Sequence, residues 1–186
     1  MRSLLLVSIV FFAAPAATAA PSVWHALPGA GRLDFTAYWQ GTPVKGQFKR
    51  FSVSASLDPA HPAGGTIEVR IATTDIATQS ADIARALRSA EWFDAGRYPD
   101  AAFTSSTIAV TAHGTLQVRG TLHLKGHEKI ITFPLSVKRA GVKLRLAGTF
   151  QLDRGDFGIG SGRWAGGEVI ATRVAVTFSV LLVPGQ

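Results

Sequence analysis

Eight stretches of this chain alternate apolar and polar residues with a period of two. In the clearest one, between Thr115 and Lys125, every second residue is leucine, valine or glycine, and the residues between them are polar or charged. A period of two indicates a β-strand with one buried face. Because several stretches reach about ten residues, against a usual strand length of about 5–6, the sequence predicts a tall sheet whose apolar face must be covered.

The predicted strands follow one another along most of the chain. They span residues 33–39, 44–57, 67–71, 103–110, 115–125, 131–137, 142–152 and 170–183. Short connections that contain glycine join several of them, which favours antiparallel neighbours.

Three positions interrupt the regular alternation. The apolar face changes parity near Lys49–Arg50 and again at Ser105–Ser106. One extra residue in a β-bulge accounts for such a change and bends the strand. Pro134 lies inside a predicted strand and lacks a backbone donor, so we expect it at a bulge or at an unpaired end.

The pattern favours an eight-stranded antiparallel barrel over an open sandwich, because closure removes exposed strand edges. A barrel of this size is either filled by its own side chains or holds one ligand. Small residues occupy several inward positions, namely Gly46, Ala55, Gly120 and Gly148. We expect them to leave room inside. From the residues alone, a ligand cavity and a self-packed core are both open alternatives.

A barrel of the outer membrane has the same number of strands but turns its apolar face to lipid. Its narrow interior would then hold Arg119, Lys138 and Arg145 without matching acids, which is costly. The chain also has only 2 Tyr and 4 Trp, a poor supply for two aromatic girdles. The apolar face is therefore predicted to point inward.

Residues 1–20 have the features of a cleaved secretory signal peptide. They combine Arg2, an apolar run over Leu4–Phe12 and the small residues Ala17–Ala19, which predicts cleavage after Ala19 or Ala20. The apolar run is shorter than the ~20 residues that cross a bilayer. Residues 21–186 then form a single exported domain.

The chain carries 19 Lys and Arg against 12 Asp and Glu, a formal net charge of +7, and no cysteine. A basic surface favours anionic partners, and export argues against nucleic acid, so we expect transient contact with an anionic membrane surface. Solubility is the alternative explanation of the charge. Without disulfides, burial and strand pairing must stabilise the fold.

One segment between the third and fourth predicted strands departs from the strand pattern. Ser80 suits a helix N-cap and Asp82 suits the first turn. Ile83 and Leu87 are one turn apart, which predicts a short helix. The following loop, residues 91–99, contains three aromatic residues. We expect the helix and this covering loop to close one end of the barrel.

The sequence shows no constellation typical of catalysis or metal binding. His123 and His127 with Glu128 lie at a strand end and a turn, a spacing that does not place them on one face. The glycine-rich run 158–162 lacks the strand and helix context of a phosphate loop and is interpreted as a flexible loop. We therefore expect neither an enzyme nor a metal site.

Two groups of motifs occur in a fixed order. The first group is Trp92–Ala95, Tyr98–Pro99 and Phe103–Ser106, and the second is Arg154–Ile159. Together they resemble the YceI-like, or polyisoprenoid-binding, family over nearly the whole chain after the first twenty residues. The resemblance implies a lipocalin-like extended barrel in the bacterial periplasm whose interior takes a long isoprenoid tail, such as that of a polyprenyl phosphate or a quinone. It also implies a homodimer.

Two positions depart from the pattern of that family. Tyr38–Gln40 stand where a histidine is common, and His127–Glu128 replace the threonine expected after Gly126. The first departure affects the contact with the head group of the ligand, and the second alters a turn.

The alternation and the resemblance together predict a periplasmic carrier of an isoprenoid lipid, with no bond chemistry and no cofactor. The predicted ligand-binding residues are Phe35, Phe48, Phe51, Val69, Ile71, Trp92, Phe93, Phe103, Val118, Leu122, Phe133, Leu144, Leu146, Phe150, Phe157, Ile159, Val176 and Phe178. Arg154 and Arg163 are candidates for contact with an anionic head group. The alternative function is a self-packed barrel that acts through its basic surface as an interaction or stress-protective module.

Overall fold

The computed structural model describes residues 22–185, so the predicted signal peptide lies outside the described residues. The strands are β1 (Ser22–Trp39), β2 (Thr42–Phe48), β3 (Phe51–Leu57), β4 (Thr66–Ala72), β5 (Ile76–Thr78), β6 (Asp100–Val110), β7 (Leu116–Leu124), β8 (His127–Ala140), β9 (Lys143–Asp153) and β10 (Arg173–Pro184). The helices are α1 (Ala81–Leu87) and two short 3-10 turns, η1 (Arg154–Phe157) and η2 (Gly162–Trp164). Within this range no helix has the length and apolar character needed to span a bilayer.

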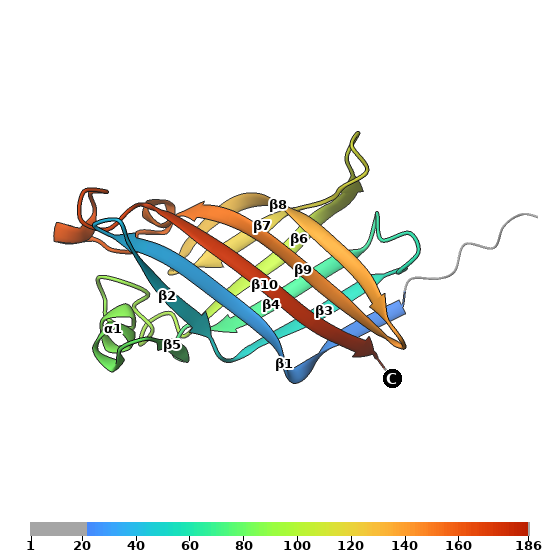
Figure 1. Ribbon diagram of the computed structural model, residues 1–186, viewed down its shortest axis with the longest axis horizontal. Helices are drawn as coiled ribbons and strands as arrows, with labels where there is room; N and C mark the ends of the chain where they lie inside the picture. Colours follow the sequence, from blue (N-terminus) through green and yellow to red (C-terminus); the bar gives the residue numbers. More distant parts are fainter. Residues whose placement is uncertain (1–21, 186) are drawn as a thin grey trace, which may run out of the picture.

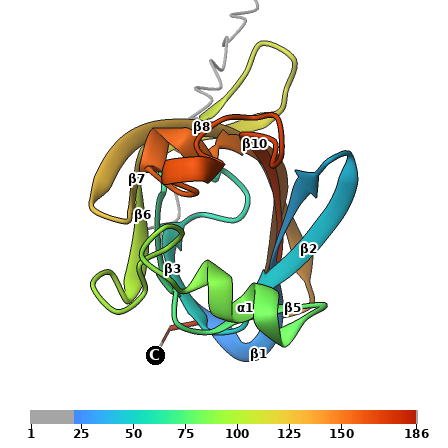
Figure 2. The ribbon, with the colours of Figure 1, turned by 90° about the vertical axis from the view of Figure 1, so that its left-hand side faces the viewer.

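Eight of the strands form a closed antiparallel ring. Pairing runs in the order β1, β10, β9, β8, β7, β6, β4 and β3, and β3 pairs again with β1. Outside the ring, β2 pairs with the C-terminal half of β1, and β5 pairs with β2. Figure 1 shows the elongated barrel from the side, and Figure 2 shows it along its axis. The predicted eight-stranded antiparallel barrel is confirmed.

The apolar side of the strands faces the interior, and the two ends of the barrel differ. In β7, Val118 and Leu122 are buried, whereas Arg119 and His123 are exposed. The helix end carries α1, β5, η1 and η2, and the hairpin end carries the β8–β9 turn and the C-terminal end of β10 (Figure 1).

The first strand is longer than the predicted 33–39, because β1 begins at Ser22. Its pairing with β10 shifts register between Ala26 and Gly31, a bulge that includes Gly29 in a left-handed conformation (φ 73°). The bulge interrupts the alternation of apolar and polar residues, so a search for a period of two does not detect the first half of the strand. That half carries Trp24, whose buried side chain covers the hairpin end. Its indole Nε1 donates a hydrogen bond to the carbonyl of Leu57 at 3.3 Å.

The predicted strand 44–57 is two strands, and the bulge predicted near Lys49–Arg50 is wrong. β2 pairs with residues 34–39 of β1, whereas β3 pairs with residues 22–25 of the same strand. Lys49 and Arg50 connect the two. The change of parity therefore marks a change of pairing partner and not an extra residue within one ladder.

The other two irregularities lie where the sequence places them. The β6–β7 register shifts between Ser105 and Thr107, and the Ser105 hydroxyl accepts a hydrogen bond from the backbone N–H of Ile67 at 2.8 Å. Pro134 pairs with Gln117 of β7, but the pairing of β8 with β9 begins only at Ser136. The missing N–H of Pro134 thus falls on the side of β8 where the paired segment has ended.

The predicted short helix is confirmed as α1. Ser80 is its N-cap, and the Ser80 hydroxyl accepts a hydrogen bond from the N–H of Asp82 at 3.2 Å. Ala84 and Leu87 are the buried residues of the helix. Figure 2 shows α1 and β5 together at one side of the helix end, where the covering loop follows them.

The small inward residues do not leave empty space, contrary to the expectation from the sequence. Phe35 faces Gly46 across β1 and β2, and Phe178 faces Gly148 across β10 and β9. A methyl group on Gly148 would lie 2.7 Å from the Phe178 ring, and one on Gly120 would lie 2.6 Å from the ring of Phe103. Each of these glycines therefore makes room for a phenylalanine ring packed over the strand.

Replacing Gly120 with alanine is expected to destabilise the protein by roughly 1–3 kcal/mol, the usual cost of overpacking a core. The added methyl group would meet both the carbonyl oxygen of Thr104, which is backbone, and the Phe103 ring. Denaturant unfolding measures the change. Gly96→Ala is the matched control, because nothing lies within 4 Å of the added atom, and an equal loss in both variants would contradict the packing explanation.

Candidate functional site

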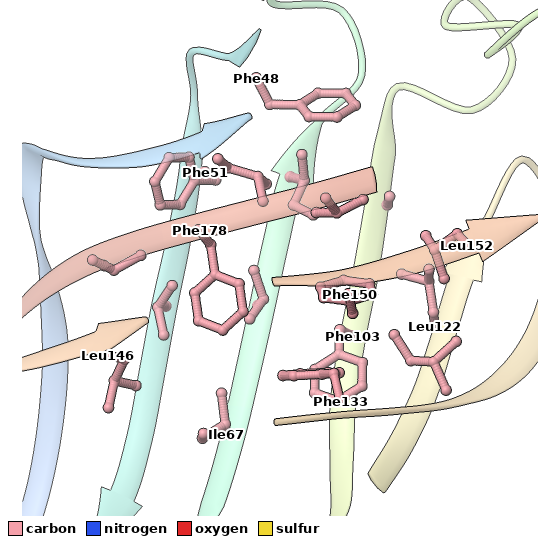
Figure 3. Close-up of a pocket in the computed structure, with 18 of the residues that line it drawn as sticks. Phe48, Phe51, Ile67, Phe103, Leu122, Phe133, Leu146, Phe150, Leu152 and Phe178 are labelled. Atoms are coloured by element: carbon pink, nitrogen blue, oxygen red, sulfur yellow. The ribbon is translucent and has the colours of Figure 1, made fainter. Parts of the chain in front are cut away.

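An apolar cavity occupies the helix-end half of the barrel (Figure 3). Its volume is about 140 Å³. All the residues that line it are apolar, and they are Leu33, Phe48, Phe51, Val53, Ile67, Val69, Ile71, Ala101, Phe103, Leu122, Leu124, Ile131, Phe133, Leu135, Leu146, Phe150, Leu152, Val176, Phe178 and Val180. Such a wall offers no hydrogen-bond partner from a side chain, so it favours hydrocarbon over any polar group.

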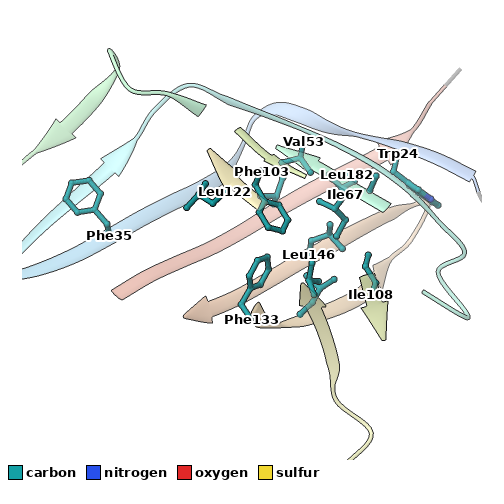
Figure 4. Packing of buried hydrophobic residues seen from close by; sticks show 14 of the residues in the cluster. Trp24, Phe35, Val53, Ile67, Phe103, Ile108, Leu122, Phe133, Leu146 and Leu182 are labelled. Atoms are coloured by element: carbon teal, nitrogen blue, oxygen red, sulfur yellow. The ribbon is translucent and has the colours of Figure 1, made fainter. Parts of the chain in front are cut away.

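The hairpin-end half of the barrel is filled by its own side chains. Leu57, Val118, Leu144 and Leu182 have no measurable exposure, and Ile108 is 2% exposed. Figure 4 shows Ile108 and Leu182 within the buried cluster, with Trp24 beyond them. The two alternatives that the sequence leaves open thus apply to different halves: one half is a self-packed core, and the other is hollow.

Phenylalanine rings shape the cavity. Phe133 lies at the centre of the group, with its ring centroid 4.8 Å from Phe150, 5.3 Å from Phe103 and 5.8 Å from Phe178. Figure 3 shows these rings projecting from different strands toward one another. The positions of these rings therefore set the shape of the cavity on this side.

Two segments cover the helix end and contact each other through Glu91. They are the loop after α1, residues 88–99, and the β9–β10 connection, residues 154–172. The carbonyl of Glu91 accepts hydrogen bonds from the N–H groups of Gly160 and Ser161 at 2.8 and 2.9 Å, and its carboxylate accepts one from Trp164 Nε1 at 3.0 Å. From the first segment, the Phe93 ring contacts the Phe48 ring of the cavity wall, with 5.6 Å between centroids.

A buried cation organises the β9–β10 connection. Arg154 is 4% exposed, and its guanidinium donates to six backbone carbonyls at 2.6–3.1 Å. These carbonyls belong to Ile159, Gly160, Trp164, Gly166, Ile170 and Ala171. Burial lowers the pKa of Arg154, and the nearby charge of Asp153 opposes that shift. The connection interpreted as a flexible loop is thus held around one side chain.

Arg154 is therefore corrected as a head-group candidate, because all three of its nitrogens already donate to carbonyls and its guanidinium is buried. Arg163 differs: it is exposed, and its guanidinium carbon lies 4.5 Å from the centre of the Trp164 ring. Its contact with a head group stays a prediction.

A second cation holds the turn between β7 and β8 against η1. Lys125 Nζ donates to the carbonyl of Gly158 at 2.7 Å. Burial lowers the pKa of Lys125, and the charge of Asp94 works against this shift. Lys129 forms an ion pair with Asp156 at 3.4 Å nearby. The His127–Glu128 turn that departs from the family pattern therefore lies against the second covering segment.

The structure places eleven of the predicted ligand-binding residues on the cavity wall. These are Phe48, Phe51, Val69, Ile71, Phe103, Leu122, Phe133, Leu146, Phe150, Val176 and Phe178. Their contact with a ligand stays a prediction. The cavity also has nine lining residues that were not predicted, and each lies two positions from a predicted one in the same strand. The period-two alternation is the signal that identifies them.

Seven predicted residues lie off the cavity wall, and the predicted placement on the wall is corrected for Phe35, Val118 and Leu144. Val118 and Leu144 belong to the self-packed half, where the barrel has no free space. Phe35 covers Gly46 on the β1–β2 hairpin. The other four belong to the covering segments at the helix end, where their contact with a ligand stays a prediction, and they are Trp92, Phe93, Phe157 and Ile159.

The polar side chains of residues 22–185 form no metal-binding cluster. Across residues 22–185, no group of three or more His, Cys, Asp or Glu side chains is placed to hold a metal ion. His123 and Glu128 are cross-strand neighbours, with 3.1 Å between Nδ1 and Oε1, and both side chains are largely exposed. The absence of enzymatic activity stays a prediction.

The chain matches the YceI-like domain over residues 24–182, which includes all of the ring except the first two residues of β1 and the last two of β10. It belongs to the YceI-like family. The resemblance carried by the Trp92–Ala95 and Arg154–Ile159 motifs is confirmed, and the structure gives these motifs a role in the family fold. The first lies in one covering segment of the barrel, and the second supplies the arginine that holds the other.

Curated relatives of this YceI-like protein are similar to it in part. A UPF0312 protein of Vibrio cholerae serotype O1 is 33% identical over 126 residues, which cover 62% of this chain and 65% of the relative. A UPF0312 protein of Pseudomonas putida is 32% identical over 126 residues, covering 62% and 64%. The chain thus matches just under two thirds of the length of these relatives.

Solved structures show the same barrel. BcnA of Burkholderia cenocepacia superimposes with a TM-score of 0.80 at 27% identity, covering 84% of this chain and 98% of BcnA. A polyisoprenoid binding domain from Saccharophagus degradans, implicated in plant cell wall breakdown, has a TM-score of 0.69 at 18% identity, covering 87% and 98%. The second similarity shows a shared fold.

Proposed function

We propose that this YceI-like protein binds a lipid and that its cavity takes the isoprenoid tail. The observation that carries the proposal is the cavity wall, which is apolar at every position. Burial of hydrocarbon stabilises a complex by roughly 0.8 kcal/mol for each CH₂ group removed from water. A tail of several five-carbon units can therefore be held without polar contacts, and transport needs no bond chemistry and no cofactor.

The size of the cavity limits how much of the tail it can hold. At about 140 Å³, it is close to an apolar cavity of ~150 Å³ that holds one benzene molecule, and smaller than the roughly 300–1,000 Å³ of most ligand sites. It thus has space for about one isoprene unit in the structure described. A longer tail requires the packed rings of Phe133, Phe150 and Phe178 to rotate away from one another.

The family and the fold support the isoprenoid as the ligand class. The Saccharophagus degradans domain of the same fold is a polyisoprenoid binding domain. For the head group, a polyprenyl phosphate or a quinone is proposed, and the exposed Arg163 beside Trp164 is the proposed contact for an anionic phosphate. A homodimer is a further prediction from the family.

Export to the periplasm is part of the proposal and rests on residues 1–20. The apolar run over Leu4–Phe12 followed by Ala17–Ala19 supports processing after Ala19 or Ala20. N-terminal sequencing of protein recovered from the periplasmic fraction tests this. A chain that keeps Met1 in the cytoplasm would contradict it.

Extraction of the natively produced protein with organic solvent, followed by mass spectrometry, tests the ligand. The expected result is an isoprenoid that is absent from an equal amount of a control protein carried through the same purification. An extract without isoprenoid from folded protein would overturn the proposal.

A self-packed barrel that acts through its basic surface is the second candidate function. The solid core of the hairpin-end half is the observation that favours it. An extract without lipid, together with retained binding to an anionic partner, would support this function in place of the first.

A further inference from the structure

Four cations surround the turn between β8 and β9. We call Lys138–Arg145 the basic hairpin, and its cations are Lys138, Arg139, Lys143 and Arg145. Lys138 and Arg145 lie directly opposite each other in the ladder, and both are exposed on the outer face. Like charges placed directly opposite across two strands destabilise a sheet. Arg145 donates one hydrogen bond, from Nη1 to the Ser179 hydroxyl at 3.1 Å, but this neutral partner does not offset the repulsion between the two cations.

No acidic side chain compensates the basic hairpin. The sequence has no Asp or Glu from Lys129 to Leu152, none in β7 and none in β10. β7 and β10 are the strands that flank the hairpin in the ring. Among the ion pairs of residues 22–185, none involves the four cations. Asp58 follows β3 at the same end, but it forms no ion pair with the four cations, and its carboxylate accepts a hydrogen bond from the backbone N–H of Ala60 at 2.8 Å.

The tip of the basic hairpin is apolar. Val142 is 75% exposed, and Gly141 before it takes the left-handed conformation of a tight turn (φ 64°). Figure 1 shows this turn at the hairpin end, beside the C-terminal end of β10 and far from α1. An exposed aliphatic side chain among unpaired cations fits the boundary between charged head groups and acyl chains. It adds nothing to the recognition of a nucleic acid or another purely ionic polymer.

We propose that the basic hairpin docks the protein on an anionic phospholipid bilayer, with Val142 entering the head-group region. The proposal does not depend on a ligand in the cavity, because the hairpin belongs to the self-packed half. Docking at this end leaves the cavity half and its covering segments on the side away from the bilayer, free to contact a further partner.

Co-sedimentation with vesicles tests the proposal. The purified protein is expected to bind vesicles that contain phosphatidylglycerol and not vesicles of phosphatidylcholine alone, and added salt should weaken binding. Each cation near an anionic surface raises the partition coefficient of the protein onto the vesicles by roughly fivefold. The variant Lys138→Gln/Arg145→Gln should therefore bind about 25-fold more weakly, and its thermal stability should be unchanged or slightly higher because the like-charge pair is gone.

The control has the same net charge as that variant. Lys45→Gln/Arg70→Gln removes two exposed cations from β2 and β4 that form none of the ion pairs of residues 22–185, and should bind vesicles as the unaltered protein does. Val142→Ser should weaken binding and reduce its resistance to salt. Equal losses in the hairpin variant and the control, or tighter retention by a DNA duplex than by the anionic vesicles, would overturn the proposal.

Discussion

Replacing Arg154 with alanine is expected to lower the free energy of unfolding by about 3–5 kcal/mol, the largest stability effect of any single substitution we predict. For a domain of this length, each 1 kcal/mol corresponds to roughly 2–4 °C in Tm, so the melting temperature should fall by about 10 °C. The cause is the loss of the partner of six backbone carbonyls at once. Buried carbonyls without donors are costly.

The Arg154→Lys variant separates the contribution of the positive charge from that of the hydrogen-bond geometry. Arg154→Lys keeps the charge but has one nitrogen in place of the three that donate here, so it should recover only a small part of the lost stability. Arg163→Ala is the matched control, because Arg163 is exposed and should change stability by no more than about 0.5 kcal/mol. Comparable unfolding midpoints for Arg154→Ala and the unaltered protein would show that the carbonyls find other partners.

The Val176→Trp variant is expected to lose its bound tail while it keeps the fold. Val176 lines the cavity from β10, and the larger indole would occupy most of the about 140 Å³ available there. Loss of space for one five-carbon unit removes roughly 4 kcal/mol of hydrophobic stabilisation, so affinity should fall on the order of 100- to 1,000-fold. Mass spectrometry of organic extracts measures the retained isoprenoid per mole of protein.

Thr177→Trp is the control for Val176→Trp. Thr177 is the next residue of β10, is exposed and points outward, so the same side chain added there leaves the cavity unchanged. Far-UV and near-UV circular dichroism of both variants establishes that the barrel is intact. If Val176→Trp retains as much isoprenoid as Thr177→Trp, then the tail does not occupy this cavity.

Both expectations depend on one division of the barrel into a solid half and a hollow half. At the hairpin end, leucine, isoleucine and valine side chains meet on the axis and exclude space, as Leu144 and Leu182 do. At the helix end, large rings line the wall, and residues 88–99 and 154–172 cover the opening. The stability of the cover depends on Arg154, and the capacity of the cavity depends on the rings.

Local signals in the sequence are sufficient for the strands and for α1. The alternation in β7 requires one buried face, and Ser80 followed by Asp82 specifies a helix start, because both depend only on near neighbours. The same alternation extends to the nine cavity residues that were not predicted. By contrast, the β1 bulge removes the alternation locally, so Trp24 and the first half of that strand were missed.

Contacts between distant residues account for the corrections. Within its own strand nothing prevents a methyl group on Gly148, but the carbonyl oxygen of Pro134 from β8 and the Phe178 ring from β10 occupy that space. From the sequence, Arg154 is expected to be a surface cation. It is buried because the residues that follow it fold around its guanidinium, which donates to the carbonyls of Trp164 and Ile170. Neither effect leaves a periodic trace in the sequence.

The amino-acid order by itself determined which side of each strand is apolar, where the helix starts and to which family the chain belongs, because periodicity, capping and motif order are local properties. Only the tertiary structure decided which apolar residues enclose space and which fill it. That distinction depends on how rings and aliphatic side chains from different strands meet on the barrel axis, and closure of β1 against β10 brings those side chains together.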